Sequence, residues 1–140
     1  MVNIVSGYGD IGAHLVRHSG VDKIAFTGST EVGYDIIRNS HDKNLKRISL
    51  ELGGKSPNII TKHANFETAL NQSFGSLFFN AGQCCNAGSR TYVHSSLYDR
   101  YVEAITNMSS KIKLGHSLAV DTEQGPLISQ EQMNKVLGYI

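Results

Sequence analysis

Several features are scarce in this sequence, and each shortage narrows what the chain can do. The 140 residues carry a formal net charge of only +1, so charge gives no reason to expect a nucleic acid or an anionic membrane as partner. No apolar run is long enough for a membrane span, and the N-terminal residues lack the pattern of a secretory signal peptide. The only cysteines, Cys84 and Cys85, are adjacent and cannot build a disulfide framework. We therefore expect a globular protein of a reducing compartment, the cytoplasm or the mitochondrial matrix.

Strand and helix patterns alternate along the chain. The sequence predicts strands over residues 2–5, 23–26, 48–52, 58–61 and 90–93. It predicts helices over residues 10–18, 30–38, 66–79, 96–115 and 129–140, the fourth with Ser96 as its N-cap. Strand, glycine turn and helix in alternation are typical of an α/β fold with a parallel sheet. The glycine pair at 53–54 breaks the pattern, so we expect one domain over 1–53 and another over 54–140.

Two glycine-containing segments are candidate nucleotide sites. Residues 7–12 match G-x-G-x-x-G between a predicted strand and a predicted helix, but Asp22 follows too early to bind a ribose. Residues 26–33 lead into a helix near Ser29, whose free N–H groups and dipole can hold an anion that Gly28 lets approach. The alternatives are a tight turn for the first segment and an ordinary capped helix for the second. The two histidines His14 and His18 have no third ligand nearby in the pattern, so we expect no metal site.

Two further residues are candidates for catalysis. Glu51 lies on the polar face of the predicted strand 48–52, just before the glycine pair, where a carboxylate can act as a general base. The cysteine pair lies in a small, polar turn that contains glycine and can present a thiolate nucleophile. The alternatives are a solvent-facing strand residue and two small buried hydrophobic side chains.

Three segments taken together resemble the signatures of the aldehyde dehydrogenase superfamily. They are Phe26-Thr27-Gly28-Ser29-Thr30-Glu31-Val32-Gly33, Leu50-Glu51-Leu52-Gly53-Gly54-Lys55-Ser56-Pro57 and Gly82-Gln83-Cys84-Cys85. Their order and spacing also match, and the likeness runs through the whole chain to Thr122-Glu123-Gln124-Gly125-Pro126. The chain looks most similar to the NAD-preferring branch of broad specificity. The resemblance implies a Rossmann-like parallel-sheet fold, of which this chain holds the end of the cofactor domain and the start of the catalytic domain.

The same resemblance implies roles for individual residues. Cys85, and not Cys84, would be the nucleophile that attacks the aldehyde, and Glu51 would activate the water that releases the acid. The cofactor would be NAD rather than NADP. It would contact the Gly28–Gly33 segment through Gly28, Ser29 and Gly33, with Thr27 and Leu52 at the nicotinamide, Gly9 and Asp10 near the adenine, and Gln132 near the nicotinamide ribose.

Family members are several times longer than this chain, which leaves two expectations open. The first is that the chain is an internal part of a homo-oligomeric enzyme, inactive in isolation, that oxidises a small aldehyde. The second is that the 140 residues are a truncated, non-catalytic relative that binds at most a nucleotide or a partner.

Overall fold

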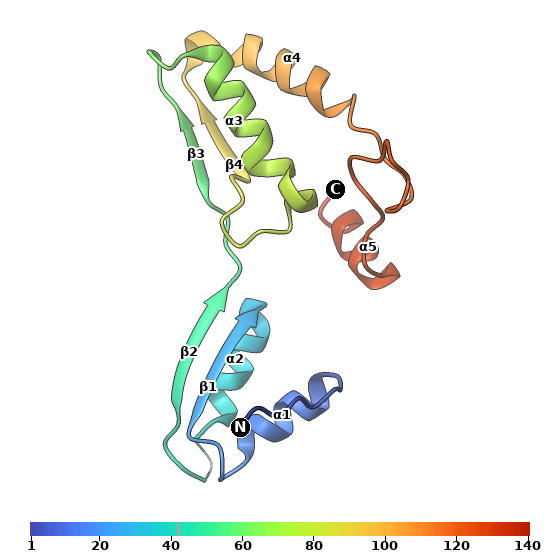
Figure 1. Cartoon of the computed structure of the whole chain (residues 1–140). Helices are drawn as coiled ribbons and strands as arrows, with labels where there is room; N and C mark the ends of the chain where they lie inside the picture. The colour runs from blue at the N-terminus through green and yellow to red at the C-terminus, as the bar shows by residue number, and fades with distance from the viewer. Residues whose placement is uncertain (42) are drawn as a thin grey trace. The chain divides into compact units, whose positions relative to one another are not determined.

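The computed structural model describes residues 1–41 and 43–140 and divides the chain into two compact units, Met1–Gly54 and Lys55–Ile140 (Figure 1). Each unit contains parallel strands connected through helices, so the predicted α/β class is confirmed. The division lies beside the glycine pair at 53–54. That the units are the cofactor and catalytic domains of an enzyme stays a prediction.

The first unit is built on a pair of parallel strands. Its described elements are α1 (Gly9–Arg17), β1 (Lys23–Gly28), α2 (Thr30–Asn39) and β2 (Arg47–Leu52). The register runs from Lys23 opposite Arg47 to Gly28 opposite Leu52. Along β2, exposed and half-buried residues alternate, as the sequence predicts for a strand with one covered face. The buried side chain of Ile36 comes from α2, which connects the two strands.

The second unit carries its own core. Its described elements are β3 (Pro57–Ile60), α3 (Phe66–Phe78), the 3-10 turn η1 (Phe79–Gly82), β4 (Arg90–Val93), the 3-10 turn η2 (Ser95–Leu97), α4 (Tyr98–Ser109) and α5 (Gln130–Leu137). Strands β3 and β4 pair in parallel, and α3 and α4 contact each other. Ile60, Leu70 and Tyr101 are buried at the centre of this core. Figure 1 shows that the segment after α3 leads back to the start of β4.

The predicted strand over residues 2–5 is wrong. These residues have no regular structure, and the side chains of Val2 and Ile4 are 87% and 89% exposed. A strand is stable only when a neighbouring strand pairs with its backbone, and no strand of the described residues pairs with this segment. The G-x-G-x-x-G match at residues 7–12 therefore runs into α1, which begins at Gly9, and does not follow a strand.

The boundaries of two helices also differ from the prediction. A 3-10 turn precedes α4, and the ring nitrogen Nδ1 of His94, not the Ser96 hydroxyl, caps that turn. Helix α4 ends at Ser109, six positions before the predicted glycine stop at residue 115. The hydroxyls of Ser109 and Ser110 donate to backbone carbonyls one turn earlier, a local bond that competes with continued helix. Helix α5 likewise ends at Leu137, before the end of the chain.

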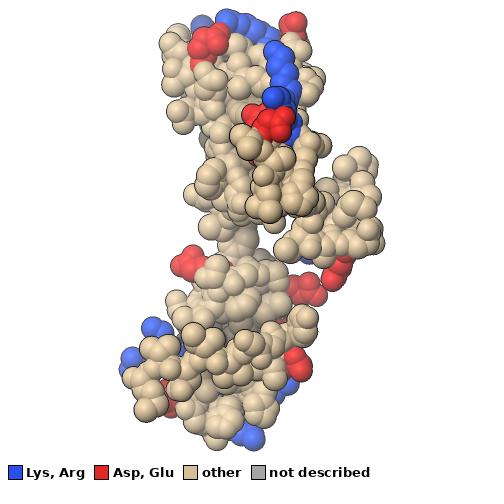
Figure 2. All heavy atoms as spheres, turned by 45° about the vertical axis from the view of Figure 1, so that its right-hand side comes forward, with Lys and Arg blue, Asp and Glu red and all other residues tan. Residues whose placement is uncertain are grey.

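Charged side chains are distributed in small groups. Figure 2 shows small groups of both signs among uncharged residues on the face that it draws, in keeping with a net charge of +1. None of the described helices is both long enough and apolar enough to cross a membrane.

Candidate active site

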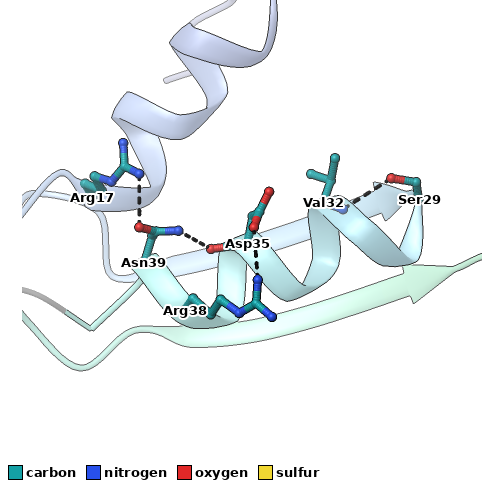
Figure 3. Close-up of polar contacts among 6 residues, drawn as sticks. All are labelled: Arg17, Ser29, Val32, Asp35, Arg38 and Asn39. Carbon is teal, nitrogen blue, oxygen red and sulfur yellow. Dashed lines mark hydrogen bonds and ion pairs between the residues drawn. The ribbon is translucent and has the colours of Figure 1, made fainter.

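Helix α2 begins with the geometry that an anion site needs. Ser29 is the N-cap, and its Oγ accepts a hydrogen bond from the Val32 N–H at 3.2 Å (Figure 3). Within the described residues, the first two N–H groups of α2 donate no hydrogen bond to the protein, which leaves them free for a ligand. A Cβ on Gly28 would overlap the tip of the Phe26 ring, so any other residue here would displace that ring. The turn thus combines unpaired backbone N–H groups with a glycine that has no side chain to obstruct a ligand.

The paired strands place further predicted residues at the same edge. In the parallel register Thr27 lies opposite Glu51, and Gly28 lies opposite Leu52. The Glu51 side chain is exposed. A Cβ on Gly33 would come within 2.9 Å of Leu52 Cδ2, so Leu52 packs against α2 where a glycine makes room. The carboxyl ends of parallel strands are where open α/β sheets bind ligands.

The structure therefore brings six predicted residues together at one edge of the first unit. They are Thr27, Gly28, Ser29, Gly33, Glu51 and Leu52.

A groove of about 610 Å³ lies between α1, α2 and β1. Gly9 lines it, together with apolar side chains that include Val16, Phe26, Val32 and Ile36. A largely apolar groove with a bare glycine at its edge suits a flat heteroaromatic ring. Asp10, predicted near the adenine, is in the first turn of α1 but does not line the groove.

One polar contact joins the two helices of the groove. Arg17 of α1 donates through Nη2 to Asn39 Oδ1 of α2 at 3.0 Å (Figure 3). Within α2, Asn39 Nδ2 donates to the Asp35 carbonyl at 2.7 Å, and Asp35 lies 3.6 Å from Arg38 in an exposed pair. The bond between Arg17 and Asn39 therefore links the C-terminal ends of the two groove walls.

The cysteine turn has an unusual backbone. After α3 ends, Asn80, Ala81 and Gly82 have φ values of 50°, 55° and 74°, in the left-handed region. This conformation disfavours residues with a Cβ, although asparagine tolerates it better than alanine does. The Asn80 side chain and backbone both bond to Gln83, whose N–H donates to the Asn80 carbonyl at 3.1 Å. Three left-handed residues in succession reverse the chain sharply just before the cysteines.

The two thiols are free and differ in exposure. Cys84 is half-buried and Cys85 is exposed, so the interpretation of both as buried hydrophobic side chains is wrong for Cys85. Within the described residues, no hydrogen bond engages the Cys85 N–H, whereas the Cys84 carbonyl accepts from Ala87 N–H at 3.1 Å. The turn thus presents a thiol and a backbone donor on the same residue.

The predicted site residues divide between the units. Cys85 and Gln132 belong to the second unit, and the remaining predicted residues belong to the first. Gln132 is half-buried in the first turn of α5, where its N–H donates to the Ser129 hydroxyl at 3.1 Å.

Sequence reasoning missed two features near these residues. One is the run of left-handed backbone at residues 80–82. Asparagine and glycine adopt this conformation readily, so Asn80 and Gly82 weakly indicated it, whereas Ala81 did not. The other is Lys46, which is only 7% exposed and donates through Nζ to backbone carbonyls at the other end of β2. A lysine in a polar segment gives no sign of burial before the fold is known.

Comparisons with known proteins assign the chain to a family. Residues 1–140 match the profile of the "Aldehyde dehydrogenase family". The chain is 50% identical over 141 aligned residues to the mitochondrial aldehyde dehydrogenase of Mesocricetus auratus, covering all of this chain and 28% of that protein. The chain thus spans little more than a quarter of the length of such relatives.

Solved structures of similar proteins share the fold. An NAD+ complex of an aldehyde dehydrogenase from Bacillus cereus superposes with a TM-score of 0.92 at 46% identity, over 95% of this chain and 27% of that one. An NAD+ complex of betaine aldehyde dehydrogenase from Staphylococcus aureus superposes with a TM-score of 0.90 at 44% identity, over 95% of this chain and 26% of that one. The fold is therefore part of the aldehyde dehydrogenase fold, and the chain belongs to the aldehyde dehydrogenase family.

Proposed function

We propose that the protein oxidises an aldehyde to a carboxylic acid with NAD, using Cys85 as nucleophile and Glu51 as general base. The observation that carries this proposal is the exposed Cys85 thiol just after a left-handed turn, in a chain 50% identical to a mitochondrial aldehyde dehydrogenase. Relatives solved with NAD+ support that cofactor.

The first unit fits a dinucleotide by its own geometry. Gly28 leaves the backbone bare beside the Phe26 ring, Ser29 caps α2, and the free N–H groups of its first turn suit a pyrophosphate. The groove beside Gly9 would hold the adenine, with Asp10 near its edge. Gly33 allows the close approach of Leu52, which with Thr27 would border the nicotinamide. Gln132 belongs to the second unit, and its contact near the nicotinamide ribose stays a prediction. When bound, NAD would accept the hydride that the substrate loses.

The proposed chemistry proceeds on Cys85. The thiolate sulfur forms a bond to the aldehyde carbonyl carbon, giving a thiohemiacetal whose oxyanion takes a hydrogen bond from the Cys85 N–H. Loss of the hydride leaves a thioester. Glu51 removes a proton from water, the resulting hydroxide attacks the thioester carbonyl, and the carboxylic acid leaves as the thiolate is restored.

The test is aldehyde-dependent formation of NADH by the protein expressed from its complete reading frame, followed at 340 nm with a short aliphatic aldehyde. Cys85→Ala is expected to abolish NADH formation, whereas Cys84→Ala retains it. Glu51→Gln is expected to give a single burst of NADH and then stall, with an acylated Cys85 detectable by mass spectrometry. Activity that survives Cys85→Ala would overturn the assignment.

The second candidate is a truncated relative without turnover. The chain covers 28% of the length of the mitochondrial relative. A mature mass near 15.3 kDa in the native protein would establish this form and exclude the enzyme as the final product. Homo-oligomerisation stays a prediction, and so does a location in the cytoplasm or the mitochondrial matrix. The mitochondrial location is consistent with a relative that is named as mitochondrial.

A further inference from the structure

A hydrogen-bonded contact joins β3 to α3 beneath the cysteine turn. Asn58 Nδ2 donates to the Ser73 hydroxyl at 2.7 Å, and that hydroxyl donates to the Ala69 carbonyl at 2.6 Å. Ser73 is only 5% exposed, and Asn58 is half-buried. The Ser73 hydroxyl therefore both accepts and donates a hydrogen bond. Removing it would leave the Asn58 amide without this acceptor.

The chain that leaves the cysteine turn comes down onto the same place. The Gly88 N–H donates to the Ser76 carbonyl at 3.2 Å, one turn along α3 from Ser73. A Cβ on Gly88 would lie 2.7 Å from Ser76 Oγ and 3.4 Å from Asn58 Cβ. The Ser76 hydroxyl in turn donates to the Ser73 carbonyl at 3.0 Å. Gly88 is buried, so the turn ends against a surface that Asn58, Ser73 and Ser76 form together.

The turn between these anchors contains conformations that the chain does not adopt by local preference. Asn80 and Ala81 carry a Cβ in the left-handed region, and such residues persist there only when the surrounding structure holds the segment. One end is the C-terminus of α3, where Phe79 N–H donates to the Gly75 carbonyl. The other end is Gly88, which the contact with Asn58 and α3 fixes.

We propose that Asn58, Ser73 and Gly88 form an anchor that positions Cys85, with Ser73 as a positioning residue that acts through Asn58 and Gly88. The proposal deepens the proposed function and rests on it for the catalytic consequence. The geometry of the thiol follows from the second unit alone. Loss of the anchor lets the turn relax, so the difference in exposure between Cys85 and Cys84 decreases.

The experiment measures how selectively a thiol reagent labels the two cysteines. The protein expressed from its complete reading frame is treated briefly with iodoacetamide, and fragment-ion mass spectrometry gives the ratio of label on Cys85 to label on Cys84. Ser73→Ala is expected to lower this ratio about threefold to fivefold, the factor that one lost hydrogen bond corresponds to. Gly88→Ala is expected to lower it at least as much, because its Cβ displaces the end of the turn.

Matched variants separate positioning from general destabilisation. Ser110→Ala removes an equivalent hydroxyl that bonds within a turn on the exposed surface, at 3.2 Å to the Asn107 carbonyl, and leaves the ratio unchanged. Ser73→Thr keeps the hydroxyl and is expected to restore most of the ratio. The double variant Asn58→Leu/Ser73→Ala is expected to lower it no further than Ser73→Ala does, because both changes remove the same bond.

The outcomes separate this proposal from the proposed function. If Ser73→Ala lowers the melting temperature but leaves the labelling ratio unchanged, the proposed anchor is refuted. The anchor is also refuted if Ser73→Thr gives a labelling ratio as low as that of Ser73→Ala. In an active enzyme, Ser73→Ala lowers kcat and leaves the KM for NAD unchanged. A changed ratio in a protein that forms no NADH supports the anchor and refutes only the proposed function.

Discussion

Lys46 provides the sharpest test of what holds the first unit together. Its Nζ donates to the carbonyls of His18 and Val21 at 2.7 and 2.9 Å, and to the Asn44 side chain. The lysine is only 7% exposed, so its ammonium group ties the turn after α1 to the start of β2. We predict that Lys46→Met, which keeps the length of the side chain but removes the charge, loosens this unit.

The magnitude follows from the acceptors that lose their donor. The net value of a hydrogen bond already includes the desolvation of the ammonium group, so the loss depends on how many buried acceptors are left without a partner, at about 1–3 kcal/mol each. The Val21 carbonyl keeps a second donor, Asn44 Nδ2 at 3.1 Å, so it is not left without a partner. The net loss of stability is about 2 kcal/mol, most of it from the His18 carbonyl.

Hydrogen exchange measures this loss where it occurs. A loss of about 2 kcal/mol raises the exchange rates of the protected amides in β1 and β2 about 30-fold, while the amides of β3 and β4 change little. Lys43→Met is the matched control, because Lys43 is exposed. Equal exchange in the two variants would refute the reasoning, and so would a uniform increase across both units.

Three further predictions concern single contacts. Ser29→Ala removes the cap of α2, lowers stability by about 1 kcal/mol and weakens NAD binding in calorimetry; unchanged binding would contradict the anion site. Gly82→Ala places a Cβ on a residue with φ of 74° and costs about 1 kcal/mol, seen as a lower melting temperature by circular dichroism; an unchanged midpoint would contradict this. Arg100→Ala removes a cation 3.6 Å from the Phe66 ring centroid and 3.0 Å from Glu67, and costs about 0.5–1 kcal/mol in urea denaturation, because the pair is exposed; a loss above 2 kcal/mol would contradict this.

Local patterns predicted most of the elements. The strand at 48–52 and the helix at 66–79 carry apolar residues at the correct period, and both appear within one residue of the prediction. The strand at 2–5 failed because a short run of three β-prone residues and one asparagine forms a strand only beside a partner, and the sequence does not say where a partner lies. The long helix from Ser96 failed at both ends, because a histidine took the capping position and serines ended the helix early.

By itself the sequence determined the order of the elements, the alternating faces of β2, the capping of α2 by Ser29 and the family. These follow from short-range periodicity, from hydrogen bonds within a few residues, and from motifs that are contiguous in the chain. Only the tertiary structure decided that Thr27 lies opposite Glu51, that Lys46 is buried, and that Asn58, Ser73 and Gly88 meet beneath the cysteines. Each of these joins residues far apart in the sequence, and such pairings depend on register and packing, which no local pattern encodes.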